Sequence, residues 1–185
     1  MDFAALRFAE QGYHPTSVAE IVEGLGVGKG VFYWYFSSKE ELFLEILREA
    51  QHDLRRTQQL AIEDEDDPVQ RIAKGMRASI EWSSGHPELH QLFAFAATEE
   101  RFAPAMRKGE EIALADAVRH VSDGIARGEI RDGDPTIMTQ AILGVTAYLV
   151  RRCVQEQGRP WDEVADAAVS FCLEGLLVPA VRTSA

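Results

Sequence analysis

The stretch TSVAEIVEGLGVGKGVFYWYFSSK, residues 16–39, constrains the fold more than any other part of the chain. Ser17, with Glu20 three positions later, forms a capping box, the pattern that marks a helix start. Gly26 stands where a left-handed residue ends that helix, and a second helix of barely two turns, residues 28–36, follows. Two short helices joined by a tight turn containing glycine are typical of a helix-turn-helix, whose second helix enters the DNA major groove.

The second helix, residues 28–36, combines two glycines with a run of aromatic residues. Glycine near its start permits close approach of the backbone, with N–H groups available to a phosphate. Phe32 and Phe36 are four residues apart and are expected to face inward, so Tyr33 and Trp34 face outward, where each can donate to phosphate oxygens. An ordinary helical hairpin with surface aromatics is the alternative interpretation.

The three N-terminal helices are expected to form a minimal bundle. The first runs from Asp2 to Gly12. The other two are the helices of the helix-turn-helix. Ser38 and Glu41 form another capping box, which opens the next helix, and this helix continues to about Ala61. The expected core residues are Phe8, Ile21, Leu25, Val27, Phe32 and Phe36.

Composition excludes several classes of protein. A net charge of −11 over 185 residues argues against bulk electrostatic attraction to nucleic acid, so any DNA contact must be local. Cys153 and Cys172 provide neither a disulfide framework nor a zinc-site spacing, and both are expected to be buried thiols in a reducing cytoplasm. No apolar run reaches the roughly 18 residues that a membrane span needs, and no secretory signal is visible.

The rest of the chain shows helical periodicity and no strand pattern, so the predicted fold is all-α with about nine helices. No catalytic triad, buried carboxylate pair or phosphate loop is present, and no catalytic residue, metal ion or cofactor is expected. The chain is therefore not predicted to be an enzyme. The further helices are expected to start at Pro68, Pro87, Pro104, Asp134 and Trp161.

Residues 12–43 resemble the DNA-binding segment of tetracycline-repressor (TetR) type regulators. The matching positions are Gly12-Tyr13, Thr16-Ser17, Ile21, Gly26-Val27, Lys29-Gly30, Tyr33, Tyr35-Phe36 and Ser38-Lys39-Glu40. The resemblance implies a DNA-binding domain over residues 1–47 and a ligand-binding and dimerisation domain over residues 48–185, in a bacterial cytoplasmic protein. The chain departs from the family pattern at Gly28 and Val31, where a polar residue and threonine are common.

The resemblance also implies a set of DNA contacts. The residues concerned are Thr16, Ser17, Lys29, Gly30, Val31, Tyr33, Trp34 and Lys39. The first two would contact the DNA backbone, the next three the groove, and the last three phosphates. Residues 1–50 carry four basic and eight acidic side chains, so binding requires a few well-placed contacts, doubled by dimerisation.

The last two helices, about 134–156 and 161–178, are apolar on more than one side. Two such pairs meeting at a two-fold axis would bury the surplus as a four-helix bundle, which predicts a homodimer. The small residues Ala141, Gly144 and Ala168 suit close helix approach. A thick monomeric core is the alternative.

The middle helices carry methionine and aromatic residues that predict either an ordinary core or an effector pocket. The candidate lining residues are Met76, Ile80, Trp82, Phe93, Phe95, Met106 and Tyr148. Arg77, Glu99 or Tyr148 would supply polar contacts to a small apolar or aromatic molecule.

Together these features predict a ligand-responsive transcriptional regulator. It would act as a repressor that a small apolar effector releases from its operator. Its predicted partners are double-stranded operator DNA, the effector and a second copy of the chain, with no membrane. The alternative is an all-α ligand- or partner-binding module that has lost sequence-specific DNA binding.

Overall fold

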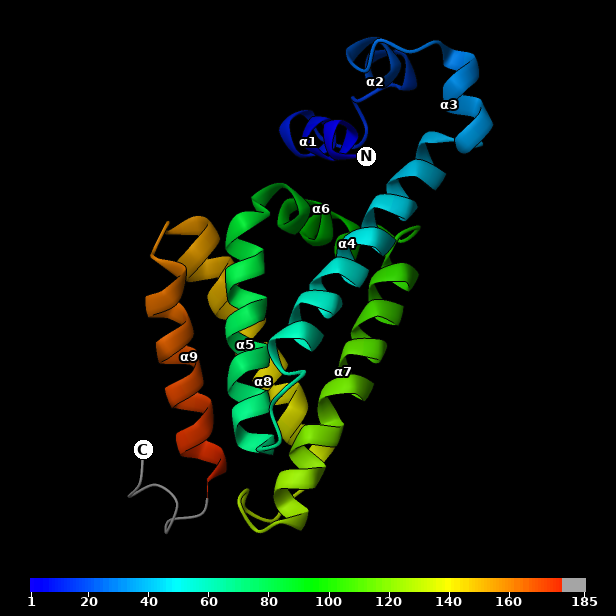
Figure 1. Ribbon diagram of the computed structural model, residues 1–185. Coiled ribbons are helices and arrows are strands. Elements are labelled where there is room, and N and C mark those ends of the chain that lie inside the picture. Colours follow the sequence, from blue (N-terminus) through cyan, green and yellow to red (C-terminus); the bar gives the residue numbers. More distant parts are fainter. Residues whose placement is uncertain (178–185) are drawn as a thin grey trace. The chain divides into compact units, whose positions relative to one another are not determined.

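The computed structural model describes residues 1–177, and within that range it is helical without strands, as predicted (Figure 1). The helices are α1 (Asp2–Gln11), α2 (Val18–Gly24), α3 (Lys29–Tyr35), α4 (Lys39–Ala61), α5 (Pro68–Gly85), α6 (Pro87–Thr98), α7 (Ala103–Ala126), α8 (Pro135–Leu149), the π-helical η1 (Val150–Glu156) and α9 (Trp161–Leu176). The predicted end of the last helix, Val178, lies outside the described residues.

Packing divides the chain into two compact units. The first comprises Met1–Asp53 and His86–Gly109, and the second comprises Leu54–Gly85 and the residues from Glu110 on. The helices of residues 86–109 thus pack with the N-terminal helices, although the sequence places them far away. The predicted division into residues 1–47 and 48–185 follows the chain rather than this packing.

In the first unit, the helix-turn-helix forms where the capping pattern places it. The Glu20 N–H donates to the Ser17 hydroxyl oxygen at 3.2 Å, and the Ser17 N–H donates to the Glu20 carboxylate at 2.7 Å. The turn after α2 contains Gly26 with φ of 67°, a conformation that a side chain would strain. These local interactions separate α2 from α3 within a few residues.

The start of α4 differs from the predicted capping box. The Glu41 N–H donates to the Ser38 hydroxyl at 3.1 Å, as expected. The Glu41 carboxylate, however, accepts from the hydroxyl and the N–H of Ser37, at 2.5 and 2.6 Å. These two bonds lower the pKa of Glu41, the hydroxyl contributing most. The carboxylate therefore fixes the connection between α3 and α4 one residue earlier than predicted.

The core prediction for the first unit is right for Phe8, Ile21 and Phe32, which are buried. It is wrong for Leu25 and Val27, which are 52% and 40% exposed. Both follow the last residue of α2, so they lie beyond the helical face that periodicity assigns to the core. Phe36 is partly buried and packs against the same cluster.

Aromatic rings fill the centre of the first unit. The Phe43 ring is fully buried, with its centroid 5.2 Å from Phe8, 4.9 Å from Tyr13 and 4.6 Å from Phe102. The Phe95 ring of α6 lies 5.9 Å from Phe43 and 5.8 Å from Tyr13. Each tilted or edge-on pair adds to the free energy of burial. The cluster joins segments that are more than 80 residues apart in the sequence.

Lys39, the first residue of α4, is directed at the connection between α1 and α2. Its Nζ donates to the carbonyl oxygens of Tyr13 at 2.7 Å, Thr16 at 2.8 Å and His14 at 3.3 Å. It also lies 4.3 Å from the centroid of the Tyr13 ring. Burial lowers the pKa of Lys39, and the positive charge of Arg101 lowers it further. We call this set of contacts the Lys39 clamp, because it uses the three donors of the ammonium group.

In the second unit, α5 and α9 pack along each other, with α8 and η1 against them (Figure 1). Ile80, Ala165 and Ala168 are almost completely inaccessible at the centre of this core. The Asp134 carboxylate caps α8 as predicted, accepting the N–H groups of Thr136 and Ile137 at 2.8 and 3.2 Å. Because Ala168 is completely buried in this core, it packs within its own chain and is not available to a second copy.

The two thiols are free, and only Cys172 is fully buried, whereas Cys153 is half-buried. Burial raises the pKa of the Cys172 thiol.

The predicted helix over residues 134–156 changes character at Leu149, where the π-helical η1 begins. The Gln155 side chain in η1 donates to the Ser83 carbonyl oxygen at 2.6 Å, which ties η1 to α5. The segment Pro135–Glu156 is long and apolar enough, by length and composition alone, to cross a membrane, contrary to the sequence expectation. Core helices of globular proteins pass the same test, and one side of α8 does pack into the core through Met138 and Ile142.

The Lys39 clamp predicts an asymmetric response to removing two lysine charges. Lys39→Met removes three hydrogen bonds, two of them part-buried, and should lower the free energy of unfolding by about 2–4 kcal/mol. Lys29→Met, at an exposed position, should change it by less than about 0.5 kcal/mol. Urea unfolding monitored by circular dichroism measures both. Equal stability of the two variants would show that the clamp does not hold this unit together.

Candidate DNA-binding surface and effector cavity

The outer side of α3 presents aromatic rings to solvent. Trp34 is 83% exposed and Tyr33 is 55% exposed, whereas Phe32 between α3 and the core is buried. The Trp34 and Tyr35 rings stack with centroids 6.0 Å apart. This is the inward and outward division that the aromatic spacing predicts. The exposed rings have polar groups that can donate hydrogen bonds to a ligand.

The two glycines at the start of α3 differ in position, because Gly28 is the N-cap and Gly30 lies in the first turn of the helix. A Cβ atom at Gly28 or Gly30 would meet no atom within 4 Å, and neither residue has positive φ. Glycine in a helix costs about 0.5–1 kcal/mol relative to alanine. Glycine is favoured at an N-cap, which accounts for Gly28, whereas neither packing nor backbone conformation requires glycine at Gly30.

The predicted DNA-binding residues fall into two groups. Six of them lie at the accessible surface of α2 and α3 or at their ends: Ser17, Lys29, Gly30, Val31, Tyr33 and Trp34. The other two are used within the chain. The Thr16 side chain is completely buried and its hydroxyl donates to the Gly12 carbonyl oxygen at 2.8 Å. The Lys39 ammonium group is held in the clamp.

Thr16 and Lys39 therefore direct their polar groups at backbone carbonyl groups of the chain itself. Local sequence patterns place both residues near the helix-turn-helix, but they do not show which way a side chain turns. Lys29 is the one basic side chain of α3, and no ion pair involves it within residues 1–177.

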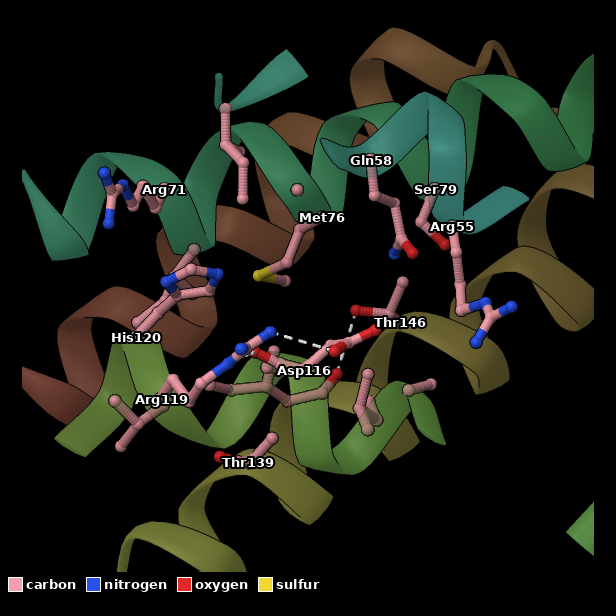
Figure 2. A pocket seen from close by; sticks show the side chains of 18 of the residues that line it. Arg55, Gln58, Arg71, Met76, Ser79, Asp116, Arg119, His120, Thr139 and Thr146 are labelled. Atoms are coloured by element: carbon pink, nitrogen blue, oxygen red, sulfur yellow. Dashed lines mark hydrogen bonds and ion pairs between the residues drawn. The ribbon is translucent and has the colours of Figure 1, made fainter. Parts of the chain in front are cut away.

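The second unit contains a cavity of about 190 Å³, shown in Figure 2. Its wall is formed by the end of α4, by α5, by α7 and by α8. Met76, Ile72 and Ile142 provide apolar surface. The polar and charged lining residues include Arg55, Arg71, Asp116, Arg119, His120 and Thr146.

Of the predicted pocket residues, only Met76 lines this cavity. Ile80 and Trp82 are buried on α5 away from it, and Phe93, Phe95 and Met106 pack against the core of the first unit. Tyr148 is exposed on α8, with the Arg151 guanidinium 5.6 Å from its ring centroid.

Two suggested polar contacts are also used elsewhere. Arg77 pairs with Asp166 at 2.5 Å, and Glu99 pairs with His14 at 3.6 Å. Helical periodicity cannot separate a residue that fills a core from one that borders a cavity. The sequence analysis missed Arg119 and His120, which lie among other charged residues of α7, so no local signal marks them as lining a cavity.

Most charged groups around the cavity have partners. Arg119 donates to the Asp116 carboxylate at 2.9 Å, a bond visible in Figure 2, and Arg71 donates to the Glu65 carbonyl oxygen. Two buried atoms, Arg55 Nε and His120 Nδ1, have no hydrogen-bond partner among the described residues.

Burial lowers the pKa of His120, and the charges of Arg71 and then Arg119 lower it further. The imidazole is therefore a neutral polar group near pH 7. The cavity thus combines an apolar surface with a half-buried arginine, Arg55, whose Nε–H lacks an acceptor.

Comparison with known proteins gives matches to both parts of the chain. Residues 2–46 match the family model "Bacterial regulatory proteins, tetR family", and residues 65–176, more than half of the chain, match "Tetracyclin repressor-like, C-terminal domain". The chain is 25% identical to the HTH-type transcriptional regulator YhgD of Bacillus subtilis over 152 residues, covering 81% of this chain and 80% of that protein.

Two further matches extend over most of the chain. The fatty acid metabolism regulator protein of Bacillus subtilis is 23% identical over 170 residues, 89% of this chain and 86% of that protein. The structure of the ketosteroid transcriptional regulator KstR2 of Mycobacterium tuberculosis superimposes with a TM-score of 0.74 at 26% identity, covering 96% of this chain and 92% of that one.

These relatives are transcriptional regulators and not enzymes. Both the helix-turn-helix half and the helical C-terminal half are accounted for by models of one family. The chain therefore belongs to the TetR family of bacterial transcriptional regulators.

Proposed function

We propose that this chain is a repressor that binds operator DNA as a homodimer and leaves it when a small effector occupies the cavity of the second unit. The observation that carries the DNA-binding part is the surface of α3. Its start has two glycines with open space above them, and exposed Tyr33 and Trp34 follow within one turn. A duplex lying against this surface would explain the absence of a side chain at Gly30, because a backbone without Cβ atoms can approach DNA closely.

The proposed contacts divide by chemistry. Lys29, Tyr33 and Trp34 would donate to phosphate oxygens, which position the protein without reading sequence. Val31, which is 45% exposed, would contact the methyl group of a thymine in the major groove. In this proposal Thr16 and Lys39 hold α2 and the start of α4 in place.

Dimerisation is supported by apolar surface that the second unit leaves uncovered. Ile137 and Tyr148 of α8 are 64% and 55% exposed, and Phe171 of α9 is 69% exposed. Between them on α8, Ala141 and Gly144 are exposed small residues at helical spacing. We propose that these faces of α8 and α9 pack against their copies as a four-helix bundle, which would place two α3 helices about 34 Å apart, one turn of DNA.

Coupling between effector and DNA is proposed to run along α4. This helix begins with Lys39 of the clamp, and near its other end Arg55 and Gln58 line the cavity. An effector that contacts Arg55 therefore touches the same helix that follows α3. It can change the affinity for operator only by as much as its own affinity differs between the two conformations of the protein.

A cytoplasmic location and an effector with an apolar body complete the proposal. Two of the matched relatives are named for ketosteroid regulation and fatty acid metabolism, which supports an apolar metabolite. A second candidate function, a ligand- or partner-binding module without DNA binding, is favoured by one observation. Residues 1–50 carry twice as many acidic as basic side chains.

Selection of binding sites from random DNA, followed by mobility shift, tests the proposal and separates the two candidates. Tyr33→Ala should weaken binding to the selected operator about three- to tenfold through loss of a hydrogen bond. Lys29→Met should weaken binding and reduce the dependence of log K on log salt by about one unit for each phosphate that is no longer neutralised. Leu60→Ala, an exposed apolar residue on α4, is the control and should bind like the parent protein. Failure to select any DNA would favour the second candidate.

Alanine substitution at Gly30 should change stability and DNA binding in opposite directions. The free energy of unfolding should rise by about 0.4–1 kcal/mol, because alanine restricts the unfolded chain and meets no atom in the folded one. Operator affinity should fall about tenfold, about 1.4 kcal/mol, because the backbone can no longer approach the duplex closely. Gly85→Ala at the end of α5, also in open space, should stabilise the chain without changing operator affinity. If Gly30→Ala binds operator as tightly as the parent protein, close approach of the backbone at Gly30 does not contribute to DNA binding.

The dimer proposal predicts that one charge on α9 separates the two copies. Phe171→Arg places an uncompensated charge on the proposed four-helix interface and should convert a dimer to a monomer in sedimentation equilibrium at micromolar concentration. Leu60→Arg, at a position of similar exposure on α4, should leave the mass unchanged. An identical mass for both variants would place the interface elsewhere.

A further inference from the structure

We infer that the ligand of the cavity in the second unit is a small carboxylic acid, with an apolar body about the size of one aromatic ring and a carboxylate bound by Arg55. The inference deepens the proposed function, because it names the chemical class of the proposed effector. It depends on four features of the cavity wall: an unpaired guanidinium, partners for the other charges, a neutral histidine, and apolar surface of limited volume.

The unpaired guanidinium is the first feature. Arg55 Nε is buried without an acceptor, and no ion pair involves Arg55 within residues 1–177. The Arg55 side chain as a whole is half-buried, but a buried N–H without an acceptor is costly, and the cost falls when a carboxylate binds it. The edge formed by Nε–H and the neighbouring terminal N–H offers two parallel donors, a geometry that matches the two oxygens of a carboxylate.

The other cationic groups of the wall are already occupied. Arg119 is held by the Asp116 carboxylate, and Arg71 is held by the Glu65 carbonyl oxygen and by Asp66 at 4.0 Å. His120 cannot supply the missing counter-charge, because its environment favours the neutral form. An anion entering the cavity therefore finds its strongest available partner at Arg55. This positive site occurs in a chain whose overall charge is −11.

Arg55 lies at one polar end of the cavity, apart from the other basic residues. In Figure 2, Arg55 lies on one side of Met76, and Arg71 and His120 lie on the other. A ligand bound through its carboxylate at Arg55 would extend its body along Met76. The apolar residues Ile72, Val121 and Ile142 would then contact that body.

The volume limits the size of the body. An apolar cavity of about 150 Å³ holds one benzene molecule. The cavity volume of about 190 Å³ therefore accommodates one ring and a short chain that ends in a carboxylate. Larger amphiphiles would require the wall to move. A phosphate monoester would bring a second negative charge, for which the wall has no further unpaired cation among the described residues.

The test compares 3-phenylpropionate with its primary amide, 3-phenylpropionamide, by isothermal titration calorimetry on the full chain. The two probes have almost the same shape, and only the first carries a charge at pH 7. The acid should bind at least about tenfold more tightly than the amide, because only the carboxylate brings a negative charge and two acceptor oxygens to the guanidinium. Equal affinities would overturn the inference. A dissociation constant of the acid above about 10 mM would overturn it too, because binding that weak does not indicate a specific site.

Two arginine variants locate the charge. Arg55→Met keeps the length of the side chain and should lower the affinity for the acid to that for the amide, with the affinity for the amide unchanged. Arg56→Met is the matched control, since the neighbouring arginine on α4 is exposed and does not line the cavity. Equal losses in both variants would overturn the assignment to Arg55. If Arg55→Met does not fold, as judged by circular dichroism, the comparison of acid and amide on the unchanged chain decides.

Calorimetry without DNA keeps this inference distinct from the proposed function. If the acid binds through Arg55 but the chain selects no operator, the ligand class stands and the repressor proposal fails. If the chain binds operator but acid and amide bind equally, the repressor proposal stands and the ligand class fails. Addition of 3-phenylpropionate to the operator complex should release DNA from the parent protein and not from Arg55→Met.

Discussion

The ammonium group of Lys39 holds together the part of the fold on which the rest of the first unit depends. Its hydrogen bonds reach three carbonyl groups in the connection between α1 and α2, while its own backbone begins α4. The connection contains no regular structure, so its carbonyl groups would otherwise lack donors from the protein. The same Tyr13 that accepts from Lys39 packs its ring against Phe43. One side chain thus links the polar frame of the helix-turn-helix to its aromatic core.

The sequence predicts those parts of the structure that depend on neighbours in the chain. The capping box at Ser17, the left-handed Gly26 and the cap at Asp134 all form as expected, because each involves residues within four positions. Interactions between distant segments were not predictable in this way. Thr16 and Lys39 match a family pattern, yet their side chains turn inward to partners that no local pattern identifies.

The cavity shows the same limit more strongly. Its wall brings Arg55 and His120 together from helices that are 65 residues apart in the chain, and both occupy ordinary polar positions in the pattern of amphipathic helices. Two aromatic residues that the sequence made candidates for a ligand site, Phe93 and Phe95, instead pack against the core of the first unit. A polar group without a partner becomes visible only when the surrounding atoms are placed, since the absence of an acceptor is a property of three-dimensional packing.

The exposure of Trp34 gives the chain an optical property. Its indole lies in water on α3, whereas the indole of Trp82 is enclosed within α5 and its neighbours, and the third, Trp161, is intermediate. A solvated indole emits at longer wavelength than an enclosed one, and small solutes such as iodide or acrylamide quench it more readily. The intrinsic fluorescence of the unlabelled protein thus has a red component from Trp34 that reports on α3 and a blue component from Trp82 that reports on its buried surroundings on α5.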